Sequence, residues 1–206
     1  MNKMFLALAI ATVSALAQYH MQPAGAPPRQ LAPEIRDALA KDGAGIAGPK
    51  SAICDIWLRK KAPLDGDNHE RDASFRNIQQ GALLGAIRFQ TSATDRRGQT
   101  LDAGVYTMRL SFFPVNENHR EISPTRDFIL LVPAADDRDL DAAPDFERLV
   151  KMSAKASGTA HPAVLNVWKP DSAGPALLKH EGDDWVLYAS MGDVPIAILV
   201  IGTYLQ

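Results

Sequence analysis

The sequence contains almost no cysteine. Cys54 is the only thiol among 206 residues, so no disulfide can form within one chain and no C-x-x-C pair exists. Cys54 lies in Ile53-Cys54-Asp55-Ile56, an apolar run typical of a strand. This setting predicts a buried, inert thiol rather than a nucleophile.

An excess of charge of either sign is also absent. The 22 Lys and Arg residues nearly balance the 24 Asp and Glu residues, and no basic patch stands out along the chain. Binding to nucleic acid requires clustered cations, so the composition argues against a nucleic-acid partner. No apolar stretch after residue 17 approaches the roughly 20 residues that a membrane-spanning helix needs, so no transmembrane segment is expected in the mature chain.

The usual local signatures of catalysis are missing as well. The sequence has no S-x-x-K, no H-E-x-x-H, no P-loop and no dinucleotide-binding glycine fingerprint. The nearest match to a G-x-S-x-G nucleophile elbow is Tyr188-Ala189-Ser190-Met191-Gly192, which has tyrosine in place of the first glycine. These absences favour a protein without catalytic activity, although a site assembled from distant residues remains compatible with them.

What is present begins with an export signal. Lys3 precedes an apolar run that ends in Ala15-Leu16-Ala17, the small-x-small pattern that signal peptidase cleaves. We expect residues 1–17 to be a signal peptide and the mature chain to be periplasmic or secreted. Export without disulfides is typical of a bacterial periplasm. Residues 18–30, rich in Pro, Gly, Gln and Ala, are expected to form a flexible leader.

Two short helices are expected in the remaining chain. Residues 33–43 begin with proline and glutamate, end at a glycine, and repeat apolar residues at four-residue spacing. Residues 144–158 have the same chemistry at both ends, with lysines near the carboxyl end. Both segments are short amphipathic helices in this interpretation.

Short strands account for most of the rest. Runs of aliphatic, β-branched and aromatic residues between turn residues predict strands at 52–59, 82–90, 105–113, 128–132, 163–168, 185–189 and 194–204. Because no βαβ alternation is visible, we expect an all-β single domain over residues 31–206, a β-sandwich or jelly roll with two short helices. The apolar run 194–201 is expected to be a central strand rather than an exposed dimer edge.

Two motifs in the middle of the chain resemble those of a known group. Gly104-Val105-Tyr106-Thr107-Met108-Arg109 is followed by Ser123-Pro124-Thr125-Arg126-Asp127-Phe128 and then by an apolar strand. Exported bacterial β-sandwich proteins of unknown function carry a similar G-x-Y-T-hydrophobic-R strand and a similar S-P-x-R-D-F segment. The resemblance implies an exported β fold and brings no activity with it.

The most polar local cluster is residues 116–127, which join two predicted strands at a position where sandwiches carry binding loops. His119 has the chemistry of an acid, a base or a metal ligand, and Glu117, Glu121 or Asp127 would orient it. The predicted ligand-binding residues are therefore Glu117, His119, Arg126 and Asp127. The alternative is a solvated connection in which Arg126 and Asp127 pair with each other.

Cleavage after Ala17 would create a metal site. The mature chain would begin Gln18-Tyr19-His20, whose amine, two backbone amides and imidazole form the square-planar nitrogen set that Cu(II) and Ni(II) prefer. A one-residue shift in cleavage, or cyclisation of Gln18, would remove this site. The acidic stretches 65–70 and 137–141 resemble calcium loops but lack the complete ligand pattern, which favours ordinary polar segments.

These patterns leave three functions open. The leading one is an exported, non-catalytic binding or accessory protein. The alternatives are a periplasmic copper-binding protein and a hydrolase with its site near His119. Trp57, Trp168 and Trp185 each fall in a predicted strand and are expected in the core, with an aromatic platform for sugars as the alternative.

Overall fold

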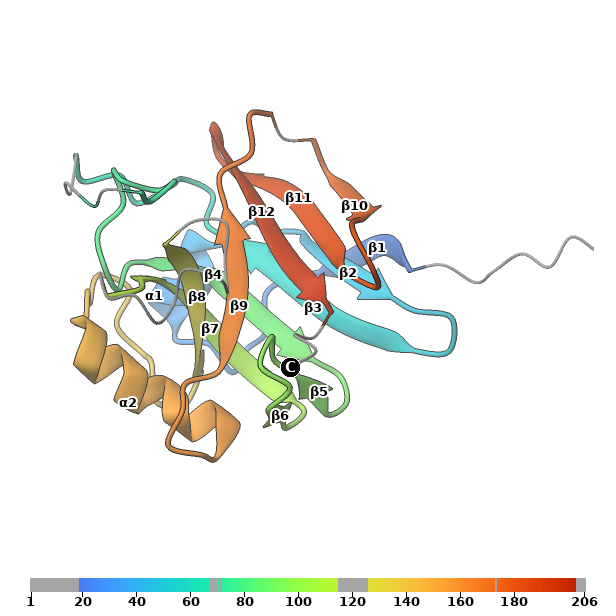
Figure 1. The fold of residues 1–206 in the computed structure, drawn as a ribbon, viewed down its shortest axis with the longest axis horizontal. Coiled ribbons are helices and arrows are strands. Elements are labelled where there is room, and N and C mark those ends of the chain that lie inside the picture. The colour runs from blue at the N-terminus through green and yellow to red at the C-terminus, as the bar shows by residue number, and fades with distance from the viewer. Residues whose placement is uncertain (1–18, 67–69, 71, 115–125, 173, 203–206) are drawn as a thin grey trace, which may run out of the picture.

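Strands are the main regular elements of the molecule, and two helices lie on its outside (Figure 1). The computed structural model describes residues 19–66, 70, 72–114, 126–172 and 174–202. In chain order the elements are β1 (His20–Gly25), α1 (Pro33–Ala38), β2 (Gly43–Ala47), β3 (Ala52–Leu58), β4 (Leu83–Phe89), β5 (Ala93–Thr94), β6 (Thr100–Leu101), β7 (Gly104–Phe112), β8 (Asp127–Pro133), α2 (Phe146–Ser157), β9 (Val164–Trp168), β10 (Ala176–Lys179), β11 (Trp185–Met191) and β12 (Val194–Ile201). The predicted all-β domain with two short helices is confirmed.

The large strands form one antiparallel sheet in the order β1-β2-β3-β4-β7-β8-β9-β12-β11-β10, and β5 pairs with β6 alone. After β9 the chain crosses to the far edge at β10 and returns through β11 and β12 to lie beside β9, which is a Greek-key connection. The sheet folds over until its edge strands β1 and β10 come close together. The apolar run 194–201 forms β12 between β9 and β11, so the prediction of a central strand is confirmed.

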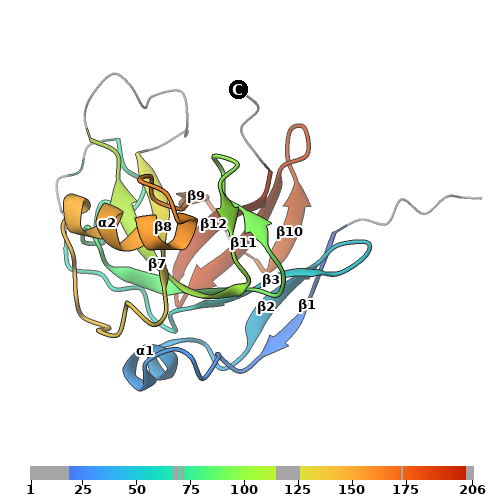
Figure 2. The ribbon, with the colours of Figure 1, turned by 90° about the horizontal axis from the view of Figure 1, so that it is seen from below.

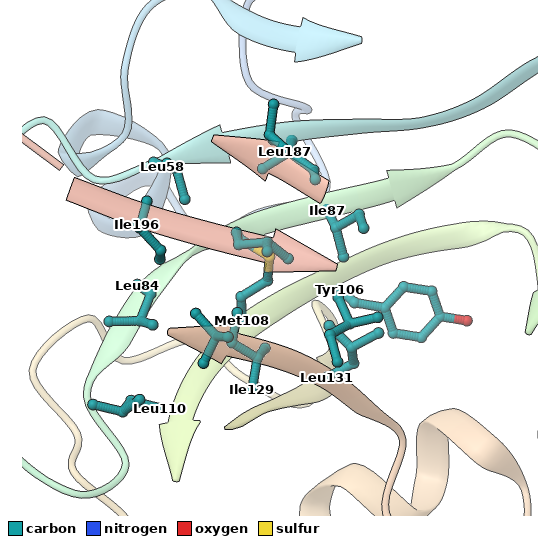
Figure 3. Packing of buried hydrophobic residues seen from close by; sticks show 14 of the residues in the cluster. Leu58, Leu84, Ile87, Tyr106, Met108, Leu110, Ile129, Leu131, Leu187 and Ile196 are labelled. Atoms are coloured by element: carbon teal, nitrogen blue, oxygen red, sulfur yellow. The ribbon is translucent and has the colours of Figure 1, made fainter. Parts of the chain in front are cut away.

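The main core lies inside the folded sheet. Successive residues of a strand point to opposite faces, so Ile129 and Leu131 of β8 point inward while Leu130 between them points outward. Figure 3 shows these inward side chains in one cluster with Leu187 of β11 and Ile196 of β12. The two layers of the sheet therefore bury a shared apolar interior, which is the dominant stabilising contribution in a domain of this kind.

Cys54 belongs to this interior and is fully buried. Burial raises the pKa of the thiol far above its ordinary value, and the neighbouring Asp55 carboxylate adds to the rise. The thiolate is the reactive form of cysteine, so this thiol is held neutral and out of reach. The predicted buried, inert cysteine is confirmed.

The helices cover part of the outer face of the sheet. In α1, Ile35 packs with Trp57 of β3, and in α2, Leu149 packs with Leu130 of β8. Figures 1 and 2 show both helices away from β10, β11 and β12, whose outer face has no described helix over it. No helix in the described part of the chain is long and apolar enough to span a membrane.

The amino-terminal part of the domain differs from the expected flexible leader. Residues 20–25 form β1, which pairs antiparallel with β2. Trp57 donates a hydrogen bond of 2.7 Å from Nε1 to the Gly25 carbonyl, and the Tyr19 ring meets the Trp185 ring edge-on at a centroid distance of 5.3 Å. The prediction is wrong for residues 20–25 because backbone pairing and two tryptophan contacts outweigh the low strand propensity of the segment.

The first helix is shorter than the predicted 33–43. It ends at Ala38, because Leu39 is extended and forms an antiparallel bridge with Arg59, the residue after β3. Gly43 starts β2 instead of ending the helix, and a Cβ atom there would clash with the Trp57 indole. Glycine at this position therefore serves the close packing of a strand against an aromatic ring.

Candidate functional site

The predicted ligand-binding loop is only partly described. Arg126 and Asp127 lie at the start of β8, and Glu117 and His119 lie outside the described residues. A role of His119 in binding, metal coordination or hydrolysis therefore stays a prediction. The two described residues show what this end of the loop does.

Asp127 is fully buried and binds backbone. Its two carboxylate oxygens accept hydrogen bonds from the N–H groups of Ser74, at 2.6 Å, and Phe75, at 2.8 Å. Bonds from backbone amides to a carboxylate are strong for their type because the acceptor is charged. Asp127 therefore fixes the chain around residues 74–75 against the start of β8.

Arg126 binds different partners from those of Asp127. Its Nε and Nη2 atoms donate to the Phe113 carbonyl at 2.9 and 2.6 Å, and Nη1 lies 2.7 Å from a Glu70 carboxylate oxygen. The predicted pair between Arg126 and Asp127 is wrong, because each side chain ties a different segment to the ends of β7 and β8. These two residues of the S-P-x-R-D-F motif hold neighbouring described segments against the ends of β7 and β8.

The predicted amino-terminal metal site falls at the start of β1. Gln18 lies outside the described residues, Tyr19 packs on Trp185, and His20 is the first residue of β1, paired with Ala47. A square-planar site would need the backbone of Tyr19 and His20 to wrap around the ion, so metal binding would compete with this pairing. Among the described residues, no group of three or more His, Cys, Asp and Glu side chains has the arrangement of a metal site.

A buried charged cluster, which the sequence did not reveal, lies on the outer face of β7. The guanidinium of Arg109 is fully buried and makes a bidentate pair with Asp137, with Nε–Oδ2 at 2.6 Å and Nη2–Oδ1 at 2.7 Å. Thr107 donates to Asp137 Oδ2 at 2.5 Å. The motif G-x-Y-T-hydrophobic-R thus supplies two side chains that hold one carboxylate.

The remaining donors of Arg109 are also used. Nη1 donates to the carbonyls of Gly81 and Ala142 at 2.8 and 2.5 Å, and Nη2 donates to the Asp139 carbonyl at 2.6 Å. A guanidinium has five N–H donors, and all five have acceptors here. Because no donor remains for a ligand, this cluster fastens the segment before α2 onto β7.

The acidic stretch 137–141 belongs to the segment that Arg109 holds against β7. Asp137 binds Arg109, and the Asp139 side chain accepts hydrogen bonds from the backbone N–H groups of Asp141, at 3.0 Å, and Ala142, at 3.1 Å. Two of its acids are therefore occupied by internal contacts. This arrangement agrees with a polar segment leading to a helix rather than a calcium loop.

A second unpredicted cluster lies on the open outer face of β9, β11 and the chain that follows β10. It consists of Trp168, His180 and Tyr188, called here the ring cluster. The His180 ring lies 6.0 Å from the Trp168 ring, edge-to-face at 67°, and 6.1 Å from the Tyr188 ring, nearly parallel at 24°. The imidazole Nε2 and the Tyr188 hydroxyl are 2.7 Å apart, within hydrogen-bonding distance.

Strand register explains why these rings meet. Trp168 of β9 and Tyr188 of β11 both pair with Ala197 of β12, which lies between them in the sheet. The small side chain of Ala197 leaves space for the larger rings on either side. His180 is exposed, while Trp168 and Tyr188 are half-buried against an apolar patch that contains Ala197.

Sequence reasoning missed this cluster for two reasons. Trp168 was expected in the core with Trp57 and Trp185, which are indeed buried, whereas Trp168 lies on the outer face. The short strand β10 and the histidine after it gave no strand pattern. The sequence did contain one indication of the cluster, the tryptophan at the end of a predicted strand. A sugar platform is the alternative to a core position for this residue.

The chemistry of the ring cluster suits binding. Within the described residues no carboxylate is hydrogen-bonded to His180, so the acid–base relay that orients a catalytic histidine is not formed there. The cluster offers aromatic surface together with the second imidazole nitrogen and a phenolic oxygen. These groups can hold a flat ligand by stacking and by hydrogen bonds at its edge.

Comparisons with known proteins add no identification. A scan against family models, a search of curated proteins and a search of solved structures each found no match for this chain. The resemblance to exported β-sandwich proteins therefore stays a prediction. The function must be inferred from the geometry of the chain itself.

Proposed function

We propose that this chain is an exported, non-catalytic binding protein that holds its ligand on the ring cluster. The observation that carries the proposal is the exposed His180 ring between Trp168 and Tyr188, on the outer sheet face that the described helices leave open. Exposed aromatic groups with a polar edge are enriched where proteins bind other molecules.

The other polar features of the described fold support this choice of site by contrast. Arg109 uses all its donors within the chain, and both oxygens of Asp127 hold backbone amides. Groups that are buried and fully bonded have no capacity left for a ligand. In the ring cluster His180 is exposed and keeps one imidazole nitrogen without a partner among the described residues.

Retention on the cell envelope tests this proposal. Purified mature protein would be mixed with washed envelope fractions of the source organism, and the bound fraction measured after sedimentation. We expect wild-type protein to be retained, and we expect Tyr188→Ala and His180→Ala to reduce the retained fraction at least about tenfold, because each removes a ring contact.

The matched control is Leu64→Ala, which removes another exposed apolar side chain, 51% accessible, far from these rings in the sequence. Its retention should equal that of wild type. Retention of all variants at the wild-type level, or no retention of the wild type, would show that the ring cluster is not a binding site.

A further inference from the structure

The geometry points to a ligand class, an uncharged saccharide, whose pyranose face stacks on the near-parallel His180 and Tyr188 rings beside Trp168. This inference rests on the proposed binding function and names its ligand. A sugar ring has one face of C–H groups and a rim of hydroxyls, so it needs an aromatic surface bordered by hydrogen-bonding atoms. The ring cluster has both, and four further observations narrow the choice.

Charge favours a neutral ligand. The exposed charged residues within three positions of the rings in the sequence are of both signs: Lys169, Asp171, Lys179, Glu181 and Asp183. A site for an anion or a cation concentrates charge of the opposite sign. Neither sign is concentrated around the rings, so complementarity favours an uncharged molecule.

The arrangement of the rings favours a flat ligand over a proline-rich peptide. Peptides in the polyproline conformation dock into grooves between aromatic ridges. Here the His180 and Tyr188 rings are near-parallel at 24° and joined by a 2.7 Å contact, so together they form one platform, and the Trp168 ring is inclined at 67° to His180. A single platform offers stacking area and no slot between two parallel ridges.

Hydrogen-bonding capacity matches hydroxyl groups. The contact between His180 Nε2 and the Tyr188 hydroxyl fixes the orientation of both rings. The second imidazole nitrogen and a lone pair of the phenolic oxygen then remain available to a ligand. Hydrogen-bonding atoms at the edge of an aromatic surface suit the equatorial hydroxyls of a sugar.

Exposed aliphatic side chains are sparse on this face, which disfavours a second copy of the chain as the ligand. A stable protein interface buries about 800 Å² on each partner and has an apolar centre. On this face Leu178 of β10, 51% accessible, is the one large aliphatic side chain among the described residues that is strongly exposed. The surface therefore fits a small ring system better than a protein face.

Affinity electrophoresis tests the saccharide directly. The folded mature protein would be run through native gels that contain hydroxyethylcellulose, glycol chitin, mannan or glycogen, with a gel lacking polysaccharide as reference. We expect retardation by at least one of these neutral polymers, and at least about a tenfold weaker apparent affinity for Trp168→Ala. His180→Ala, which changes an exposed residue and should fold normally, is expected to weaken binding as well, while Leu64→Ala should leave it unchanged.

Two treatments of the envelope separate this inference from the proposed function. Periodate, which cleaves the vicinal diols of hexose polymers such as mannan and glycogen but not 1,4-linked N-acetylhexosamines, should abolish retention of the wild-type protein unless glycol chitin is the polymer that retards it. Protease should leave retention intact. Retention that survives periodate and is lost after protease, or retention by a column of immobilised proline-rich peptide in place of the polysaccharides, would overturn the saccharide inference and leave the proposed binding function unaffected.

The electrophoresis has its own contradicting outcomes. Retardation by none of the polymers, or equal retardation of wild type and His180→Ala, would also overturn the saccharide inference. Envelope retention that ignores the ring cluster would overturn both.

Discussion

The outer face of the sheet carries two polar clusters that differ in what covers them. Over β7, the segment before α2 covers Arg109 and Asp137, which are 0% and 3% accessible and bonded only to the chain itself. Over β9, β11 and β12, no described helix covers the rings, and His180 remains exposed. The charged groups of the first cluster have no hydrogen-bonding capacity left for a ligand. The second cluster has no carboxylate or guanidinium, and it keeps hydrogen-bonding atoms for a ligand.

This difference distinguishes a cluster that stabilises the fold from a cluster that can bind a ligand. Burying a charge is expensive unless it is paired and fully hydrogen-bonded, so a buried and satisfied pair indicates a structural role. The exposed His180 ring contributes little to the fold and can exchange water for a ligand. We therefore expect variants of the covered cluster to change stability, and variants of the open cluster to change binding.

The largest effect is expected from Asp137→Ala. Removal of one partner leaves the buried Arg109 guanidinium without its countercharge, which typically costs about 3–5 kcal/mol. The free energy of unfolding in urea measures the loss. The envelope retention of any protein that remains folded should match that of wild type.

Asp136→Ala is the matched control for that change. Asp136 is the preceding residue, and its carboxylate pairs at 2.8 Å with Lys155 on the exposed surface of α2. An exposed ion pair contributes at most about 1 kcal/mol. Equal losses for the two variants would contradict the structural role assigned to the Arg109–Asp137 pair.

A smaller loss is expected from Asp127→Ala. The change leaves the N–H groups of Ser74 and Phe75 without acceptors, and an unsatisfied buried donor costs about 1–3 kcal/mol. Asp127→Asn keeps one carbonyl oxygen as an acceptor, so its free energy of unfolding should lie between those of Asp127→Ala and wild type. If Asp127→Ala unfolds at the wild-type urea concentration, then Asp127 does not hold the loop.

The sequence predicted the fold better than either cluster. The seven predicted strands are runs of large apolar residues, and each overlaps a strand of the sheet. The missed strands β1 and β2 consist largely of small and polar residues, so their strand conformation depends on pairing with neighbours. Local patterns cannot show such pairing.

The clusters depend on contacts across long separations. Arg109 and Asp137 are 28 positions apart, and nothing in either local pattern indicates that one will cover the other. Trp168 and Tyr188 meet because β12 enters the sheet between β9 and β11. The sequence showed that β9 is a strand, but the position of α2 decides which part of its outer face stays open.

An intermediate effect is expected at the amino-terminal end, where Tyr19 packs on Trp185. Tyr19→Ala should lower the free energy of unfolding by about 0.5–1.5 kcal/mol, the contribution of an aromatic pair. Tyr19→Phe keeps the ring and should behave as wild type. A loss of equal size for Tyr19→Phe would indicate that the hydroxyl, rather than the edge-on ring contact, stabilises the strand.

The same contact provides a readout for the predicted copper site. If export produces a chain that begins at Gln18, native mass spectrometry should show one bound Cu(II), and His20→Ala should abolish it. Binding should also change the tryptophan fluorescence, because the site competes with the position of Tyr19 beside Trp185. A blocked or shifted amino terminus, or unchanged binding in His20→Ala, would exclude this site.

The smallest change in stability is expected from His180→Ala and Tyr188→Phe, although both should weaken binding. Each removes the contact between the imidazole and the phenol, at 2.7 Å on an exposed face, and surface changes of this kind usually alter the free energy of unfolding by no more than about 0.5 kcal/mol. Tyr188→Phe retains the stacking ring but frees His180 to rotate, so saccharide binding should weaken less than in Tyr188→Ala. Urea unfolding and affinity electrophoresis on the same preparations measure both quantities. A stability loss near that of Asp137→Ala would mean that the rings serve the fold, and the distinction between the covered and open clusters would then fail.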